Sequence, residues 1–90
     1  MIDDMVGRVM EVMDEQRLMD NTIILYTSDH GENLGAHGLW QKMVPYDESI
    51  RVPLIVRFPR SIAEQVSSDM PASLVDVAPT LATLCGLDQN

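Results

Sequence analysis

Apolar residues recur every three or four positions in the first part of the chain, which predicts an amphipathic helix over residues 2–18. Charged residues fill many of the positions between them, so one face of this helix is apolar and the other is acidic and basic. The apolar positions are Ile2, Met5, Val6, Val9, Met10 and Met13. Gly7 weakens the pattern slightly, because glycine is a poor helix former.

Two short apolar runs predict buried β-strands. The first covers residues 22–27, is rich in β-branched side chains, and follows a break at Asp20-Asn21. The second covers residues 51–58 and is closed by Pro59. The glycine-containing segment 28–49 between them lacks a regular pattern, apart from a possible helical turn at residues 46–49. A loop of this length in a small chain indicates a function or a missing neighbour.

A second helix is expected over residues 77–85. Ser73 or Asp76 is a suitable N-cap, Pro79 fits the first turn, and Gly86 ends the pattern. Cys85 lies in the apolar pattern of this helix and is expected to be a buried small hydrophobe rather than a nucleophile.

The order helix, strand, long loop, strand, helix predicts an α/β fold, as a fragment of an α/β/α sandwich with a central largely parallel or mixed sheet. We expect the two predicted strands to run parallel, as in doubly wound sheets. Two apolar strands alone would leave unpaired backbone groups at their edges, so the chain is expected to be part of a larger domain.

The charge balance narrows the possible partners. Fourteen acidic and six basic residues give a net charge of −8, which argues against nucleic acid and against an anionic membrane surface as partners. No apolar run approaches the roughly 18 residues that cross a bilayer. Self-association through exposed apolar surface is compatible with the sequence, and the compartment is not predicted.

Asp29 and His30 directly follow the first predicted strand, at the end where open α/β sheets usually bind ligands. Neighbouring residues on a strand point to opposite faces, so both can reach one ion only if the backbone turns there, which Gly31 permits. A carboxylate beside an imidazole suits calcium, magnesium, manganese or zinc. Taken without other information, however, the two residues favour a simpler interpretation, in which Asp29 caps a helical turn and His30 is a solvated loop residue.

Three further polar residues in the long loop are candidates for a role in chemistry. Lys42 follows Trp40 in an apolar segment and could bind an oxyanion such as a sulfate or phosphate ester, or be an ordinary surface lysine. His37 could be a general acid, a ligand or a plain loop residue. Glu32 could orient His30 or begin a helical turn.

Several short motifs follow one another along the chain. They are Asp20-Asn21-Thr22-Ile23-Ile24, Thr27-Ser28-Asp29-His30-Gly31-Glu32, Leu34-Gly35, His37-Gly38-Leu39-Trp40-Gln41-Lys42, Tyr46-Asp47-Glu48-Ser49, Arg51-Val52-Pro53-Leu54-Ile55-Val56 and Val75-Asp76-Val77-Ala78-Pro79-Thr80-Leu81. Their order, and the spacing of 13 residues from Asp29 to Lys42, resemble the sulfatase family of the alkaline phosphatase superfamily. The resemblance covers essentially the whole chain.

The resemblance implies an alkaline phosphatase-like domain that hydrolyses sulfate esters with a bound divalent cation. By position, Asp29 and His30 match two of the family's metal ligands, most often for Ca²⁺, with Mg²⁺, Mn²⁺ or Zn²⁺ possible. Lys42 matches the lysine that contacts the sulfate oxygens. His30 stands where many members have asparagine. Sulfatases for choline and iduronate sulfates commonly have histidine at this position. The implied substrate of the parent enzyme is a sulfate-ester small molecule or a sulfated sugar.

The family nucleophile is a formylglycine made within Cys/Ser-x-Pro/Ala-x-Arg, and these 90 residues do not contain that motif. Cys85 is followed by Gly86-Leu87 and does not match it. We therefore expect residues 1–90 to be the C-terminal portion of a sulfatase catalytic domain, inactive without the nucleophile-bearing portion. The alternatives are a phosphonate monoester or phosphodiester hydrolase of the same superfamily, also compatible with His30, and a truncated, non-catalytic interaction protein.

Overall fold

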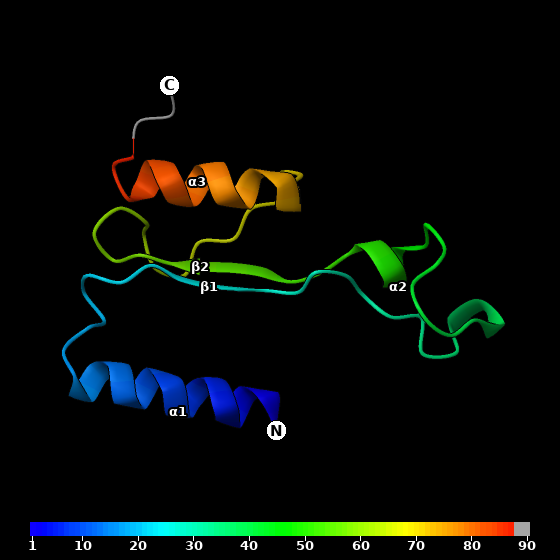
Figure 1. Ribbon diagram of the computed structural model, residues 1–90, viewed down its shortest axis with the longest axis horizontal. Helices are drawn as coiled ribbons and strands as arrows, with labels where there is room; N and C mark the ends of the chain where they lie inside the picture. Colours follow the sequence, from blue (N-terminus) through cyan, green and yellow to red (C-terminus); the bar gives the residue numbers. More distant parts are fainter. Residues whose placement is uncertain (88–90) are drawn as a thin grey trace.

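The computed structural model describes residues 1–87 and places one helix on each side of a two-stranded sheet (Figure 1). The elements follow the predicted order. They are α1 (Ile2–Glu15), β1 (Ile24–Thr27), the 3₁₀ turn η1 (Ala36–Gly38), α2 (Asp47–Ile50), β2 (Leu54–Arg57), the 3₁₀ turn η2 (Leu74–Asp76) and α3 (Val77–Leu84). Helix, sheet and helix thus form three layers, as expected for a piece of an α/β/α sandwich.

Helix α1 ends three residues earlier than predicted. Arg17 adopts a left-handed conformation, with φ of 57°, and its N–H donates to the carbonyl of Asp14 while the N–H of Leu18 donates to Met13. This is a Schellman motif, which glycine usually supplies. Because arginine rarely takes this conformation, the sequence pattern did not indicate the stop.

Helix α3 closes with the same motif, and here the sequence predicts it correctly. Gly86 has φ of 73°, and the N–H of Leu87 donates to the carbonyl of Ala82. At the other end, Ser73 caps the 3₁₀ turn η2, because its Oγ accepts from the N–H of Val75 at 3.4 Å. Asp76 is the N-cap of α3 itself and makes no capping bond with its side chain. Cys85 is exposed, which contradicts its expected burial, since the described residues do not cover this end of α3.

The two strands are antiparallel, so the expectation of a parallel pair is wrong. Ile24 pairs with Arg57 and Thr27 pairs with Leu54. Parallel neighbours need a crossover that returns along the sheet. Residues 28–53 instead run out beyond the end of β1 and double back, so β2 starts where β1 stops (Figure 1). The long loop is therefore anchored at both ends to one end of the sheet.

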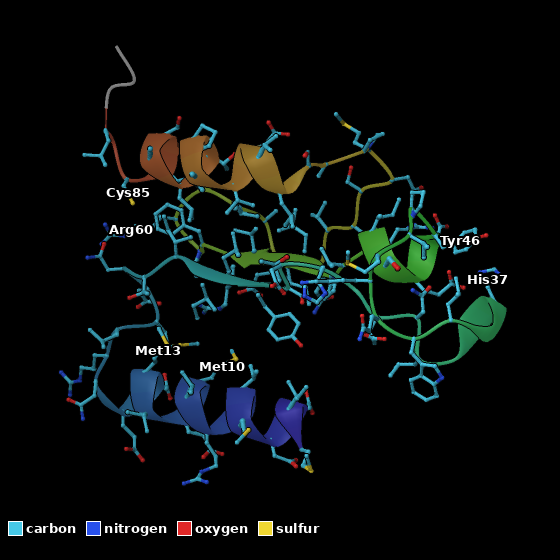
Figure 2. The ribbon with its side chains drawn as sticks, turned by 45° about the vertical axis from the view of Figure 1, so that its right-hand side comes forward. Met10, Met13, His37, Tyr46, Arg60 and Cys85 are labelled. Carbon is cyan, nitrogen blue, oxygen red and sulfur yellow. The ribbon has the colours of Figure 1, made fainter. Side chains whose placement is uncertain are left out.

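The described residues contain no fully buried apolar side chain. The chain has an accessible surface of 7775 Å², whereas a folded monomer of this mass exposes about 5300 Å². Its Cα radius of gyration is 16.0 Å, against about 12 Å for a compact chain of this length. Met10 and Met13 point from α1 toward the sheet without closing over it (Figure 2). None of the described helices is long and apolar enough to span a bilayer.

Candidate functional site

Asp29 and His30 lie just past the end of β1, where the strand gives way to the long loop. The Oγ of Ser28 donates to the carbonyl of His30 at 2.8 Å, and the backbone N–H of His30 donates to Oδ1 of Asp29 at 3.0 Å. These bonds fold the Asp29 carboxylate back over its neighbour. As a result Oδ2 of Asp29 lies 3.4 Å from Nε2 of His30, and the two side chains share one side of the backbone.

The imidazole of His30 is held in a defined orientation. Its Nδ1 lies 2.7 Å from the carbonyl oxygen of Gly31, and because a carbonyl can only accept, Nδ1 carries the hydrogen of this bond. In the neutral ring, Nε2 then presents a lone pair toward Asp29. A lone pair facing a carboxylate is favourable when a proton or a cation lies between the two groups.

The spacing of these two atoms fits neighbouring ligands of one cation. Two ligands about 2.4 Å from Ca²⁺ and at right angles lie about 3.4 Å apart, and tetrahedral Zn²⁺ gives about 3.3 Å. Octahedral Mg²⁺ requires only about 2.9 Å. The side chain of Asp29 is 82% exposed, so its oxygens are open to a ligand. Within residues 1–87, no three His, Cys, Asp or Glu side chains gather into one metal-binding group.

Electrostatics connects Lys42 with this pair. Partial desolvation raises the pKa of Asp29, but the charges of His30 and Lys42 and the backbone N–H groups of Asp29 and His30 outweigh it, so the pKa lies below its ordinary value of 3.8. The charge of Lys42 is the smallest of these influences. Lys42 lies in the loop that leaves and rejoins one end of the sheet, the end at which Asp29 and His30 stand.

Glu32 does neither of the things predicted for it. Its Oε1 accepts from the backbone N–H of Gln41, and from that of Leu34 at 3.5 Å. It therefore holds the residue next to Lys42 rather than the ring of His30.

Asn33 and Ser49 are functional candidates that the sequence did not reveal, because a polar residue in a polar loop carries no signal of burial. Each is only 3% exposed. The Nδ2 of Asn33 donates to the carbonyl of Gln41 and, at 2.9 Å, to Oγ of Ser49. Its Oδ1 is buried and has no partner among the described residues. Asn33 thus connects the Lys42 side of the loop with α2.

Gly31 is required for a different reason from the one predicted. Its φ is not left-handed, unlike those of Gly35, Gly38 and Gly86. Instead, its N–H donates to the carbonyl of Ser49 at 2.8 Å, and a Cβ there would lie 1.9 Å from the Glu48 carbonyl oxygen. Only glycine allows the backbone after His30 to approach α2 this closely.

His37 lies at the tip of the loop with Tyr46, away from the sheet (Figure 2). The two rings stack with centroids 4.2 Å apart, and Nε2 of His37 lies 3.3 Å from Oε2 of Glu48. A backbone hydrogen bond and the contact with His37 outweigh partial desolvation and hold the pKa of Glu48 below 4.5. Of the roles left open for His37, these contacts favour a structural one that fastens the loop tip to α2.

Comparison with known proteins decides the family. The sequence model of the sulfatase family matches residues 1–87. This chain belongs to the sulfatase family. The choline-sulfatase of Rhizobium meliloti is 43% identical over 86 residues, which are 96% of this chain and 16% of that protein. The N-acetylglucosamine-6-O-sulfatase of Bacteroides thetaiotaomicron is 39% identical over 87 residues, 97% of this chain and 16% of that protein.

The fold comparison agrees. A crystal structure of the putative sulfatase yidJ from Bacteroides fragilis superimposes with a TM-score of 0.89 and 38% identity, over 96% of this chain and 18% of that one. Mouse iduronate 2-sulfatase is 37% identical over 110 aligned positions, covering 96% of this chain and 20% of that protein. The predicted family and fold class are therefore confirmed. The chain spans about a sixth of the length of the curated relatives it matches.

Proposed function

We propose that this chain supplies part of the active site of a metal-dependent sulfatase, with Asp29 and His30 as two ligands of a divalent cation and Lys42 as a contact to the sulfate group. The observation that carries the proposal is the placement of Nε2 of His30 3.4 Å from Oδ2 of Asp29, just past β1 in a chain of this family. The 3.4 Å spacing of the two donor atoms suits Ca²⁺ or Zn²⁺ better than Mg²⁺. We propose Ca²⁺ because the sulfatase family, to which the chain belongs, most often binds this ion.

Each residue has a separate task in this proposal. Asp29 contributes negative charge and a hard oxygen, and His30 presents Nε2 because its Nδ1–H is engaged by Gly31. The ammonium of Lys42 neutralises charge that develops on the ester oxygens as the sulfur–oxygen bond breaks. A bound cation, which Asp29 and His30 would hold, would supply Lewis-acid stabilisation of the ester's negative charge.

The nucleophile and the remaining metal ligands must come from residues other than these 90. The formylglycine motif does not occur in these 90 residues, and two ligands fill only part of the six to eight positions of Ca²⁺. We therefore expect the 90 residues alone to lack sulfatase activity. We expect the DNA upstream of the Met1 codon, read in the same frame, to encode the Cys/Ser-x-Pro/Ala-x-Arg motif and a further pair of aspartates.

The relatives guide the choice of substrate. Their names describe sulfatases acting on choline, N-acetylglucosamine and iduronate esters. We propose a small sulfate ester or a sulfated sugar as substrate. Parallel assays with an aryl sulfate and an aryl phosphonate test this choice, and faster turnover of the phosphonate would assign the chain to a phosphonate monoester hydrolase instead.

The decisive variant is Lys42→Ala in the protein expressed at the full length of its gene, in a host that forms formylglycine. We expect kcat/KM to fall about 100-fold, which corresponds to roughly 3 kcal/mol of transition-state stabilisation. Arg60→Ala removes an equal charge at the opposite end of the sheet (Figure 2) and should leave kcat/KM unchanged. Chelation should abolish activity and Ca²⁺ should restore it. Near-normal turnover by Lys42→Ala would refute the role of this residue.

A further inference from the structure

Gln41, the residue before Lys42, is hydrogen-bonded at both its backbone N–H and its backbone carbonyl. The N–H of Gln41 donates to the Glu32 carboxylate, and the carbonyl of Gln41 accepts from the side chain of Asn33. The backbone N–H of Asn33 reaches the same carbonyl at 3.2 Å. We call Glu32, Asn33 and Gln41 the Gln41 clamp.

The clamp holds a conformation that the chain would not choose by itself. Gln41 has φ of 72°, a left-handed value that costs a non-glycine residue on the order of 1 kcal/mol. The hydrogen bonds of the clamp offset this cost. Without them, Gln41 is free to return to an extended or helical conformation, and the direction in which Lys42 leaves the backbone changes with it.

The clamp also closes the base of the hairpin-like segment 33–41 within the long loop. The N–H of Gly35 donates to the carbonyl of Leu39 at 2.9 Å, so residues 33–41 close on themselves like a hairpin. This base is anchored inside the molecule, because Asn33 is only 3% exposed and its Nδ2 also donates to Oγ of Ser49 at 2.9 Å. Lys42 is the first residue beyond this anchored point.

We infer that Glu32 and Asn33 are positioning residues that aim Lys42 at the sulfate-binding site by fixing the backbone of Gln41. The inference rests on the proposed function, because it assumes that Lys42 contacts the sulfate group. Neither side chain needs to touch the substrate. Their effect on hydrolysis passes through Lys42, which makes it measurable as an energetic coupling between sites.

The exposed member of the clamp provides a clean pair of variants. Glu32→Ala removes the acceptor of the Gln41 N–H, whereas Glu32→Gln removes the same charge but keeps an oxygen in reach. In the protein at the full length of its gene, we expect Glu32→Ala to lower kcat/KM about 10-fold and Glu32→Gln to stay within about threefold of wild type. Equal losses in both variants would mean that charge, and not the hydrogen bond, matters, and would overturn the role of Glu32 in the clamp.

A double-mutant cycle separates positioning from general structure. Glu32→Ala and Asn33→Ala are each measured with Lys42 present and in the Lys42→Ala background. A positioning role predicts about a 10-fold loss with Lys42 present and less than a twofold loss without it. Equal losses in the two backgrounds would overturn the inference, because a merely structural role does not depend on Lys42. Asn21→Ala, an exposed asparagine before β1, is the matched control.

Stability measurements keep the outcomes distinct. Ser49→Ala removes the other partner of Asn33. It should lower the melting temperature and couple to Lys42 less than Asn33→Ala does, because the bond from Asn33 to Gln41 remains. If Asn33→Ala does not fold, the inference is tested by Glu32→Ala and Glu32→Gln alone, because Glu32 lies on the surface. If Lys42→Ala turns over like wild type, the proposed function and the clamp's role fall together. If Lys42→Ala is impaired and the clamp variants are simply additive, only the clamp inference fails.

Discussion

Gly31→Ala is the sharpest test of how the site is built. The added Cβ would lie 1.9 Å from the Glu48 carbonyl oxygen and 2.9 Å from its carbon, both of them backbone atoms. Because a Cβ essentially never comes within 3.0 Å of another heavy atom, the two segments would have to separate by about 1.1 Å. A rotating side chain cannot absorb this movement, so the backbone after His30 must leave α2.

The cost follows from the contacts that this movement breaks. The bond from the Gly31 N–H to the Ser49 carbonyl, now 2.8 Å long, would be lost, at a net cost of about 1 kcal/mol. Forcing an extra carbon into a filled space adds about 1–3 kcal/mol. We therefore expect a loss of about 2–4 kcal/mol in the free energy of unfolding. The carbonyl that orients His30 belongs to the same residue, so affinity for Ca²⁺ should also fall.

Urea unfolding of the protein at the full length of its gene, with and without Ca²⁺, measures both effects. Gly7→Ala is the matched control. Gly7 lies within α1 and a Cβ there meets nothing within 4 Å, so this change should stabilise the protein by about 0.5–1 kcal/mol. Opposite signs for the two substitutions are expected. A Gly31→Ala protein as stable as wild type would refute the close approach of the loop to α2.

Two further predictions concern other contacts. Because the folded-state pKa of Glu48 lies below 4.5, ionised Glu48 stabilises the fold above about pH 4.5, and this contribution disappears as the pH falls through the folded-state pKa. The difference in urea midpoint between wild type and Glu48→Gln should therefore shrink between pH 6 and pH 3, and a constant difference would contradict the assignment. Arg57→Ala removes a bond of 2.8 Å to the Met19 carbonyl that ties β2 to the turn after α1. We expect a loss of about 1–2 kcal/mol on urea unfolding, and stability equal to that of Arg60→Ala would show that the bond contributes nothing.

Local patterns explain which elements the sequence predicted well. The periodicity of α1, the apolar runs of β1 and β2, and the Gly86 stop of α3 depend on residues within one turn or one strand of each other, and all appear in the structure. The end of α1 was missed because Arg17 takes a conformation that its side chain disfavours. The strand direction was missed because it depends on where a loop of 26 residues between β1 and β2 returns, which no local propensity decides.

The sequence by itself determined the family and indicated three candidate site residues, because the motifs that contain Asp29, His30 and Lys42 lie in local stretches of the chain. Only the tertiary structure decided how these residues are held. The close approach of Gly31 to Glu48 in α2, the burial of Asn33 against Ser49, and the hydrogen bond from the Gln41 N–H to Glu32 join segments 9 to 17 positions apart. These contacts form only when the loop folds back on itself, so no single stretch of sequence predicts them.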